Sequence, residues 1–113
     1  MSSEQAISRF FAAMNEHDGD AAMALVDPDV EVAFGPQVFR GRDAVRELAV
    51  QEHPELVFET LPVSFEARDD DGIDVDARRV QRWRQTGEVA AEEALQASFS
   101  FGPDGLIRRV ELT

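Results

Sequence analysis

The helical period of the hydrophobic pattern disappears after Pro54, and no other feature of this chain constrains the fold as strongly. Before this point apolar residues recur every three or four positions, as Ile7, Phe10, Phe11 and Met14 do, which is typical of an amphipathic helix. After it, apolar and polar residues alternate, which is typical of strands with one buried face. The sequence therefore predicts an α+β fold, with helices in the first half and an antiparallel sheet in the second.

Three helices are expected in the first half. The first covers residues 4–15, after which an Asp-Gly-Asp sequence at 18–20 interrupts the pattern. Asp20 is expected to cap a short second helix that ends at Pro28. Gly41 opens the third helix, and His53-Pro54 ends it because the residue before a proline disfavours the helical conformation.

The remaining segments are expected to be extended. Residues 30–34 and 38–39 form a small hairpin around Gly35-Pro36. After Pro54, turn signals at residues 70–72, 86–87 and 102–105 separate four strands, which form an antiparallel meander. Alternation gives these strands an apolar face, which carries Val57, Leu61, Val63 and Phe65, then Ile73, Val75, Ala77 and Trp83, and later Leu95, Ala97, Phe99 and Phe101.

Composition excludes several classes of function. A net charge of −12 repels phosphate backbones and anionic lipid surfaces, so we expect no nucleic-acid or membrane partner. The chain has no cysteine and two histidines, so neither a metal site nor another cofactor is expected. The acidity suits either solubility or a high-salt cytoplasm, and the sequence does not separate the two.

Length and the N-terminal segment lead to two further expectations. A chain of 113 residues can close one hydrophobic core, so we expect a single domain spanning residues 1–113. Its first residues lack the basic and then apolar order of a signal peptide, which leads us to expect a cytoplasmic protein.

The order of these elements is accompanied by a specific set of residues, namely Arg9 to Asn15, Asp18, Asp20, Ala24-Leu25, Val32, Arg40-Gly41 and Ala44 to Glu47. In this order and in these residues the chain resembles the nuclear transport factor 2-like superfamily, which includes the SnoaL-like and ketosteroid-isomerase-like proteins. The resemblance implies a cone, in which a curved antiparallel sheet wraps around three N-terminal helices and leaves a pocket between them. It also implies a homodimer formed through the sheet face.

The resemblance does not carry over the chemistry of the steroid isomerases. When the segments are matched, the oxyanion-binding tyrosine of that branch falls on Phe10, its base aspartate on Phe34 and its second oxyanion donor on Ala97. A phenyl ring neither takes a proton nor donates a conventional hydrogen bond, and losing one oxyanion donor costs roughly a hundredfold in rate. We therefore assign no catalytic residue, and the fold alone does not decide whether the protein is an enzyme.

Six residues are our candidates for binding a small hydrophobic molecule. Three aromatic side chains, Phe10, Phe34 and Trp83, are expected to form apolar walls. Polar contacts are expected from Arg79, Gln81 and Glu93, which share strand parity with apolar neighbours. A bulge near residues 78–79 would reverse this assignment, and the alternative is that the aromatic rings simply fill the cone.

Other chemistry remains open as an alternative. An isomerase, lyase or hydrolase could use Glu93 or His53 as a base, with Arg79 as electrostatic stabiliser, whereas His17 is expected to face solvent. An epoxide-hydrolase-like set of Asp74, Asp76 and Arg78 shares one strand face, but we interpret it as a surface charge ladder. A third interpretation is an interaction module, whose outer sheet face presents Arg78, Arg82 and Arg84 to a partner.

Overall fold

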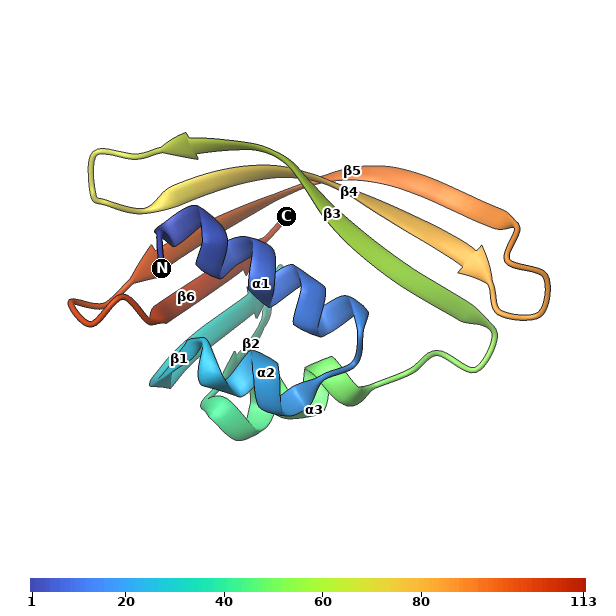
Figure 1. The fold of residues 1–113 in the computed structure, drawn as a ribbon, viewed down its shortest axis with the longest axis horizontal. Coiled ribbons are helices and arrows are strands. Elements are labelled where there is room, and N and C mark those ends of the chain that lie inside the picture. The colour runs from blue at the N-terminus through green and yellow to red at the C-terminus, as the bar shows by residue number, and fades with distance from the viewer.

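The computed structural model describes residues 1–113 and contains three helices and six strands, shown in Figure 1. In chain order they are α1 (Ser3–Asn15), α2 (Gly19–Ala24), β1 (Val26–Phe34), β2 (Gln37–Arg40), α3 (Arg42–Val50), β3 (Leu56–Ala67), β4 (Ile73–Trp83), β5 (Val89–Phe101) and β6 (Ile107–Leu112). The predicted α+β class and order of elements are confirmed. No helix is long and apolar enough to cross a membrane.

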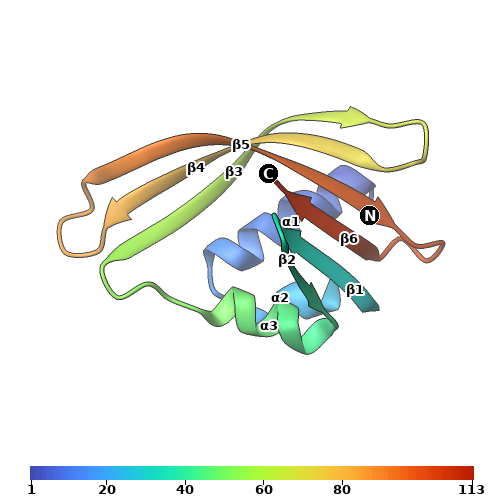
Figure 2. The same ribbon diagram turned by 180° about the vertical axis from the view of Figure 1, so that it is seen from behind.

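All six strands form one curved sheet with the order β2-β1-β6-β5-β4-β3. The four strands from β3 to β6 pair as the predicted antiparallel meander. However, β1 pairs in parallel with β6, with Val32 opposite Val110, so the sheet is mixed rather than purely antiparallel. Figures 1 and 2 show the long strands β3, β4 and β5 arching over α1, while α2 and α3 lie on the far side of α1 from this arch.

Helix α1 places the apolar stripe that its sequence predicts against the sheet. Its start is fixed by a capping box, in which the Ser2 hydroxyl accepts from the Gln5 N–H and the Gln5 side chain accepts from the Ser2 N–H. Phe10 and Phe11 are buried and meet Phe99 of β5 edge to face, at centroid distances of 6.0 and 5.6 Å. These three rings join the helix to the middle of the sheet.

Two helix boundaries differ from the prediction. Asp18, not Asp20, caps α2, because its Oδ1 accepts from the N–H of Ala21 at 3.0 Å. The helix ends at Ala24, and Pro28 lies inside β1, where the pairing with β6 is interrupted and no ladder N–H is required. In addition, α3 ends at Val50, so residues 51–55 form a connecting segment before β3.

The predicted apolar faces hold for β4 and β5 in part but fail for β3. Ile73, Val75 and Ala77 are buried, as are Ala97 and Phe99. In β3, Leu61 and Val63 are 44% and 68% exposed. The pairing with β4 shifts register between Pro62 and Ser64, and such a shift moves side chains to the other face of the sheet.

Candidate ligand cavity

A cavity of about 560 Å³ lies between α1, α3 and the concave face of the sheet. Eleven of its nineteen lining residues are hydrophobic, so most of its wall is apolar. Phe10, Phe11, Val32, Val45 and Val110 belong both to this lining and to the buried core. The wall is therefore set by the packing of the fold itself.

Polar groups gather in a few parts of the wall. The segment after α3 contributes Gln51, Glu52 and His53, together with Pro54. Asn15 and His17 come from the end of α1 and the turn after it. An apolar interior with few polar groups is the usual composition of a small-molecule site.

Three of the six predicted site residues line this cavity: Phe10, Phe34 and Arg79. The ring of Phe34 packs edge to face on Phe39, with 6.0 Å between centroids. The guanidinium of Arg79 lies over the ring of Phe58, 5.6 Å from its centroid, in cation–π geometry. Phe58 lines the cavity as well but was not among the predicted residues.

Gln81 and Glu93 do not line the cavity, but together with Arg79, which does, they form one hydrogen-bonded cluster. The Nε–H of Arg79 donates to Glu93 Oε1 at 2.6 Å, its Nη2 contacts the same oxygen, and the Gln81 amide donates to that oxygen at 3.2 Å. The hydrogen bond and positive charge of Arg79 lower the pKa of Glu93 below its ordinary value. An ionised Glu93 thus balances the single arginine of the cavity wall.

Trp83 does not form a wall of the cavity, which corrects that prediction. It lies at the end of β4, is 45% exposed, and borders a separate surface depression with Pro54 and Glu55. Parity in a strand gives the face on which a side chain stands, but not whether the cavity extends that far along the strand.

The position predicted for His17 is wrong, because this residue lines the cavity instead of facing solvent. Its backbone has φ of 56°, and its side chain is 29% exposed. Nδ1 of the ring donates to the carbonyl oxygen of Ala49 on α3 at 2.9 Å, and Nε2 lies 4.0 Å from Glu52 Oε1. The contact partner is 32 residues away in the chain, so no local pattern signals it.

His53 also lines the cavity, but its Nδ1 is occupied. This nitrogen accepts from the backbone N–H groups of Glu55 and Leu56, at 3.0 and 3.1 Å. The ring stands edge to face with Phe58 at a centroid distance of 5.9 Å. A neutral His53 consequently carries its proton on Nε2 and offers a donor there rather than a basic nitrogen.

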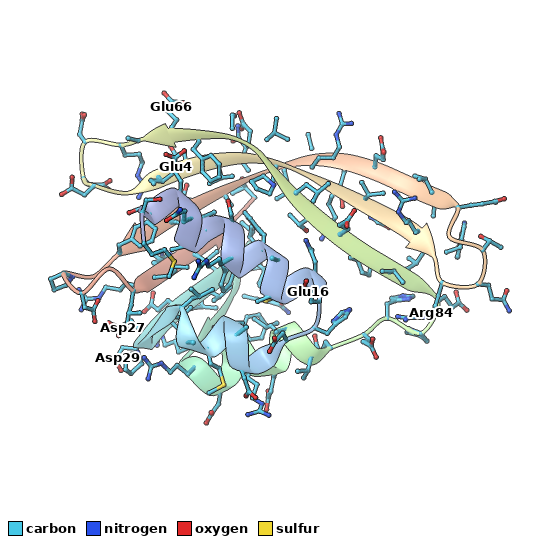
Figure 3. All side chains as sticks on the ribbon, viewed as in Figure 1. Glu4, Glu16, Asp27, Asp29, Glu66 and Arg84 are labelled. Carbon is cyan, nitrogen blue, oxygen red and sulfur yellow. The ribbon has the colours of Figure 1, made fainter.

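Arg84 holds the segment after α3 in place. Its Nη2 donates to the carbonyl oxygen of His53 at 2.8 Å, and its backbone N–H donates to that of Glu55 at 2.9 Å. Figure 3 shows Arg84 where β4 ends, beside this segment. Its Nη1 also lies 4.0 Å from Glu52 Oε1, so it restrains one side of the cavity mouth.

The epoxide-hydrolase-like set stays outside the cavity. Asp74 accepts from Ser98 Oγ at 2.8 Å and from Arg68 at 2.7 Å, contacts that lower its pKa. Asp76 interacts with Gln96, and the side chain of Arg78 is 61% exposed. These residues form the surface charge ladder that the sequence favours.

The positions matched to the steroid isomerases are apolar in the structure too. Phe10 and Phe34 present phenyl rings to the cavity, and Ala97 is 2% exposed within the core. The site therefore has neither the carboxylate base nor the two oxyanion donors at these places. An acid–base reaction in this cavity would therefore have to use other groups of the wall.

Comparison with known proteins agrees with this architecture. The family model of the SnoaL-like domain matches residues 7–110, and no curated protein matches the chain. A putative polyketide cyclase from Xanthomonas campestris pv. campestris is 18% identical, with a TM-score of 0.79 over 97% of this chain and 87% of that one. The epoxide hydrolase/cyclase-like enzyme SalBIII is 19% identical, with a TM-score of 0.77 over 97% and 88%.

A third similar structure contains a ligand. RV0760c from Mycobacterium tuberculosis, in complex with estradiol-17beta-hemisuccinate, is 13% identical, with a TM-score of 0.78 over 97% of this chain and 91% of that one. At such identities these likenesses show the fold alone, whereas the family model covers most of the sequence. The chain belongs to the SnoaL-like domain family, and its fold is that of nuclear transport factor 2-like proteins.

Proposed function

We propose that this protein binds a small, largely apolar molecule in the cavity between α1, α3 and the sheet. The observation that carries the proposal is the cavity itself, with a volume of about 560 Å³ and an apolar floor bordered by a few polar groups. Small-molecule sites typically have roughly 300–1,000 Å³ and this kind of lining. A ligand of a few fused rings fits such a space.

The charges of the wall favour a neutral ligand. Arg79 is the one arginine in the lining, and Glu93 neutralises it. The lining contains one acidic side chain, that of Glu52, and the chain as a whole carries a formal net charge of −12. A strongly anionic ligand would meet no uncompensated positive charge and would be repelled by the overall field.

The similar structures support an apolar ring skeleton for the ligand, though not its neutral charge. RV0760c holds a steroid derivative, and other similar structures are described as polyketide cyclases, whose names refer to ring-forming chemistry. We extend this to the present chain as a proposal, namely that its ligand is an apolar ring compound.

Calorimetric titration with neutral two- and three-ring compounds tests the proposal, using one substitution inside the cavity and one outside. Leu48→Trp on α3 narrows the cavity, whereas Val89→Trp places the same side chain on the exposed start of β5. We expect Leu48→Trp to weaken binding at least tenfold and Val89→Trp to leave it unchanged. Absence of binding by the folded wild type, or equal binding by both variants, would refute the proposal.

A second candidate function is acid–base catalysis on the bound molecule, as an isomerase, lyase or hydrolase. The similarity to SalBIII and the presence of His17 in the wall favour it. The two bases expected from the sequence are engaged, Glu93 by Arg79 and His53 by two backbone N–H groups. Mass and NMR spectra of the ligand after prolonged incubation separate the candidates, because an unchanged ligand means binding without turnover.

We also propose that the chain forms a homodimer through its sheet face. The support is the exposure of Leu61 and Val63, apolar side chains on one strand. Light scattering at micromolar concentration is expected to give twice the mass of the 12.6 kDa chain. A monomer at that concentration would refute this form of assembly.

A further inference from the structure

His17 occupies a backbone position that normally belongs to glycine. It follows the last turn of α1, where the N–H of Asp18 donates to Ala13 O at 2.9 Å and the N–H of His17 donates to Met14 O at 3.2 Å. These two bonds define a Schellman motif, whose left-handed residue is usually glycine because it has no Cβ. At φ of 56° His17 is in this conformation, so the chain retains a strained histidine next to its cavity.

The proton of the neutral His17 ring is fixed by the contact with Ala49. A carbonyl oxygen only accepts hydrogen bonds, so the Nδ1 at 2.9 Å from Ala49 O carries the hydrogen. The lone pair of the neutral ring is then on Nε2. The hydrogen bond of the His17 ring is made by Nδ1 and not by this nitrogen, and Glu52 Oε1 lies 4.0 Å from Nε2, beyond hydrogen-bond distance.

Of the other acceptors in the wall, those of Asn15 and His53 are engaged and that of Glu52 is more exposed. The side-chain oxygen of Asn15 accepts from the N–H of Thr60 at 2.8 Å. The Glu52 side chain is 58% exposed and lies near Arg84. His53 has the opposite tautomer, with its Nδ1 satisfied by backbone donors, and so has no free acceptor nitrogen in its neutral form.

We infer that Nε2 of His17 accepts a hydrogen bond from a hydroxyl group of the ligand, and that the ligand class is an apolar ring compound bearing a hydroxyl, such as a phenol or a cyclic alcohol. The inference rests on the proposed binding of an apolar molecule and adds the group that orients it. A hydroxyl can donate to Nε2, whereas an ether of the same ring skeleton cannot. His17 therefore discriminates between the two.

The experiment compares 2-naphthol with 2-methoxynaphthalene by calorimetry at pH 8, where an ordinary imidazole is neutral. Both compounds accept hydrogen bonds and only the naphthol donates, so the ratio of their affinities isolates an acceptor in the protein. For the wild type we expect the naphthol to bind about five- to tenfold more tightly, the effect of one net hydrogen bond. In His17→Gly, which suits the left-handed backbone, the ratio is expected to fall to about one.

Two matched variants test the assignment to His17. Glu52→Gln and His53→Gln are expected to retain the wild-type ratio. A ratio that persists in His17→Gly, or that is lost in Glu52→Gln instead, overturns the inference. Equal binding of both compounds to the wild type also overturns the inference, but it leaves the cavity as a binding site. If the wild type binds neither these two compounds nor any compound of the calorimetric panel above, the proposed function itself is refuted.

Discussion

The side-chain amide of Asn15 makes two hydrogen bonds with the backbone of Thr60, and these take the place of the bonds that a neighbouring strand would make. Its Nδ2 donates to Thr60 O at 2.8 Å, and its Oδ1 accepts from the Thr60 N–H at 2.8 Å. Because β3 is the edge of the sheet, these backbone groups have no partner strand. The last residue of α1 is thereby tied to the cavity side of the sheet.

Asn15→Ala is expected to lower the free energy of unfolding by about 1–3 kcal/mol, because it leaves a half-buried donor and acceptor without partners. Urea denaturation monitored by circular dichroism measures this change. Gln96→Ala, which removes an exposed side-chain amide from β5, serves as the control and should cost less. Equal costs for the two variants would contradict this account of the Asn15 contact.

At position 17, glycine is expected to be more stable than alanine by about 1 kcal/mol, since both lack the bond to Ala49 O but only alanine has a Cβ in the left-handed conformation. Relative to the wild type, His17→Gly is stabilised by the relief of backbone strain. It is destabilised by the loss of one hydrogen bond, which contributes about 0.5–1.5 kcal/mol to the free energy of unfolding. We therefore expect its stability to lie within about 1 kcal/mol of the wild type. Chemical denaturation of the three proteins is the measurement, and a less stable glycine variant than alanine variant would contradict the strain argument.

The pair of Arg79 and Glu93 predicts a pH dependence. Arg79 lowers the pKa of Glu93 in the folded protein, so the pair's contribution is present above the unfolded value of about 4.3 and is lost as pH falls through the folded value. The stability difference between the wild type and Glu93→Gln should therefore be present at pH 7 and shrink as acid is added. Because both side chains are exposed, the effect is expected to be small.

NMR titration of the Glu93 carboxyl gives a more direct measurement of the same shift. A midpoint at or above the ordinary value for glutamate would contradict the stabilising role of Arg79. In Arg79→Gln the midpoint is expected to move upward, toward that ordinary value, because both the hydrogen bond and the positive charge are lost.

Arg84→Gln is expected to loosen the segment after α3 without unfolding the protein. The guanidinium bonds to His53 O, and its loss removes a charge-assisted contact from residues 51–55. Hydrogen exchange should become faster at the amides of Glu55 and Leu56 and stay unchanged in β5 and β6. Unchanged exchange throughout the molecule would show that other contacts hold this segment.

The elements were predictable because their signals are local. The spacing of Ile7, Phe10 and Phe11 identifies α1, and turn residues such as Gly72 and Gly87 separate the strands. These features depend on residues within a few positions of one another. The apolar wall of the cavity was also predicted in part from the sequence, since Phe10 and Phe34 do line the cavity.

The predictions that were wrong concern features that depend on contacts between distant residues or on the register of the strands. The shift between Pro62 and Ser64 leaves Leu61 and Val63 exposed, and a strict alternation cannot represent such a shift. Trp83 has the expected parity but lies past the cavity. The polar part of the wall depends on the contact of His17 with Ala49, and neither residue carries a local signal of the other.

The parallel pairing of β1 with β6 also constrains how the chain folds. β6 is the only strand that joins β1 and β2 to the meander of β3, β4 and β5. Until β6 takes its place, the hairpin and the meander are two separate sheets with open edges. A ribosome that synthesises the chain from its first residue supplies this joining strand after all the others, so the complete sheet can form only in a late, cooperative step with large loop closure.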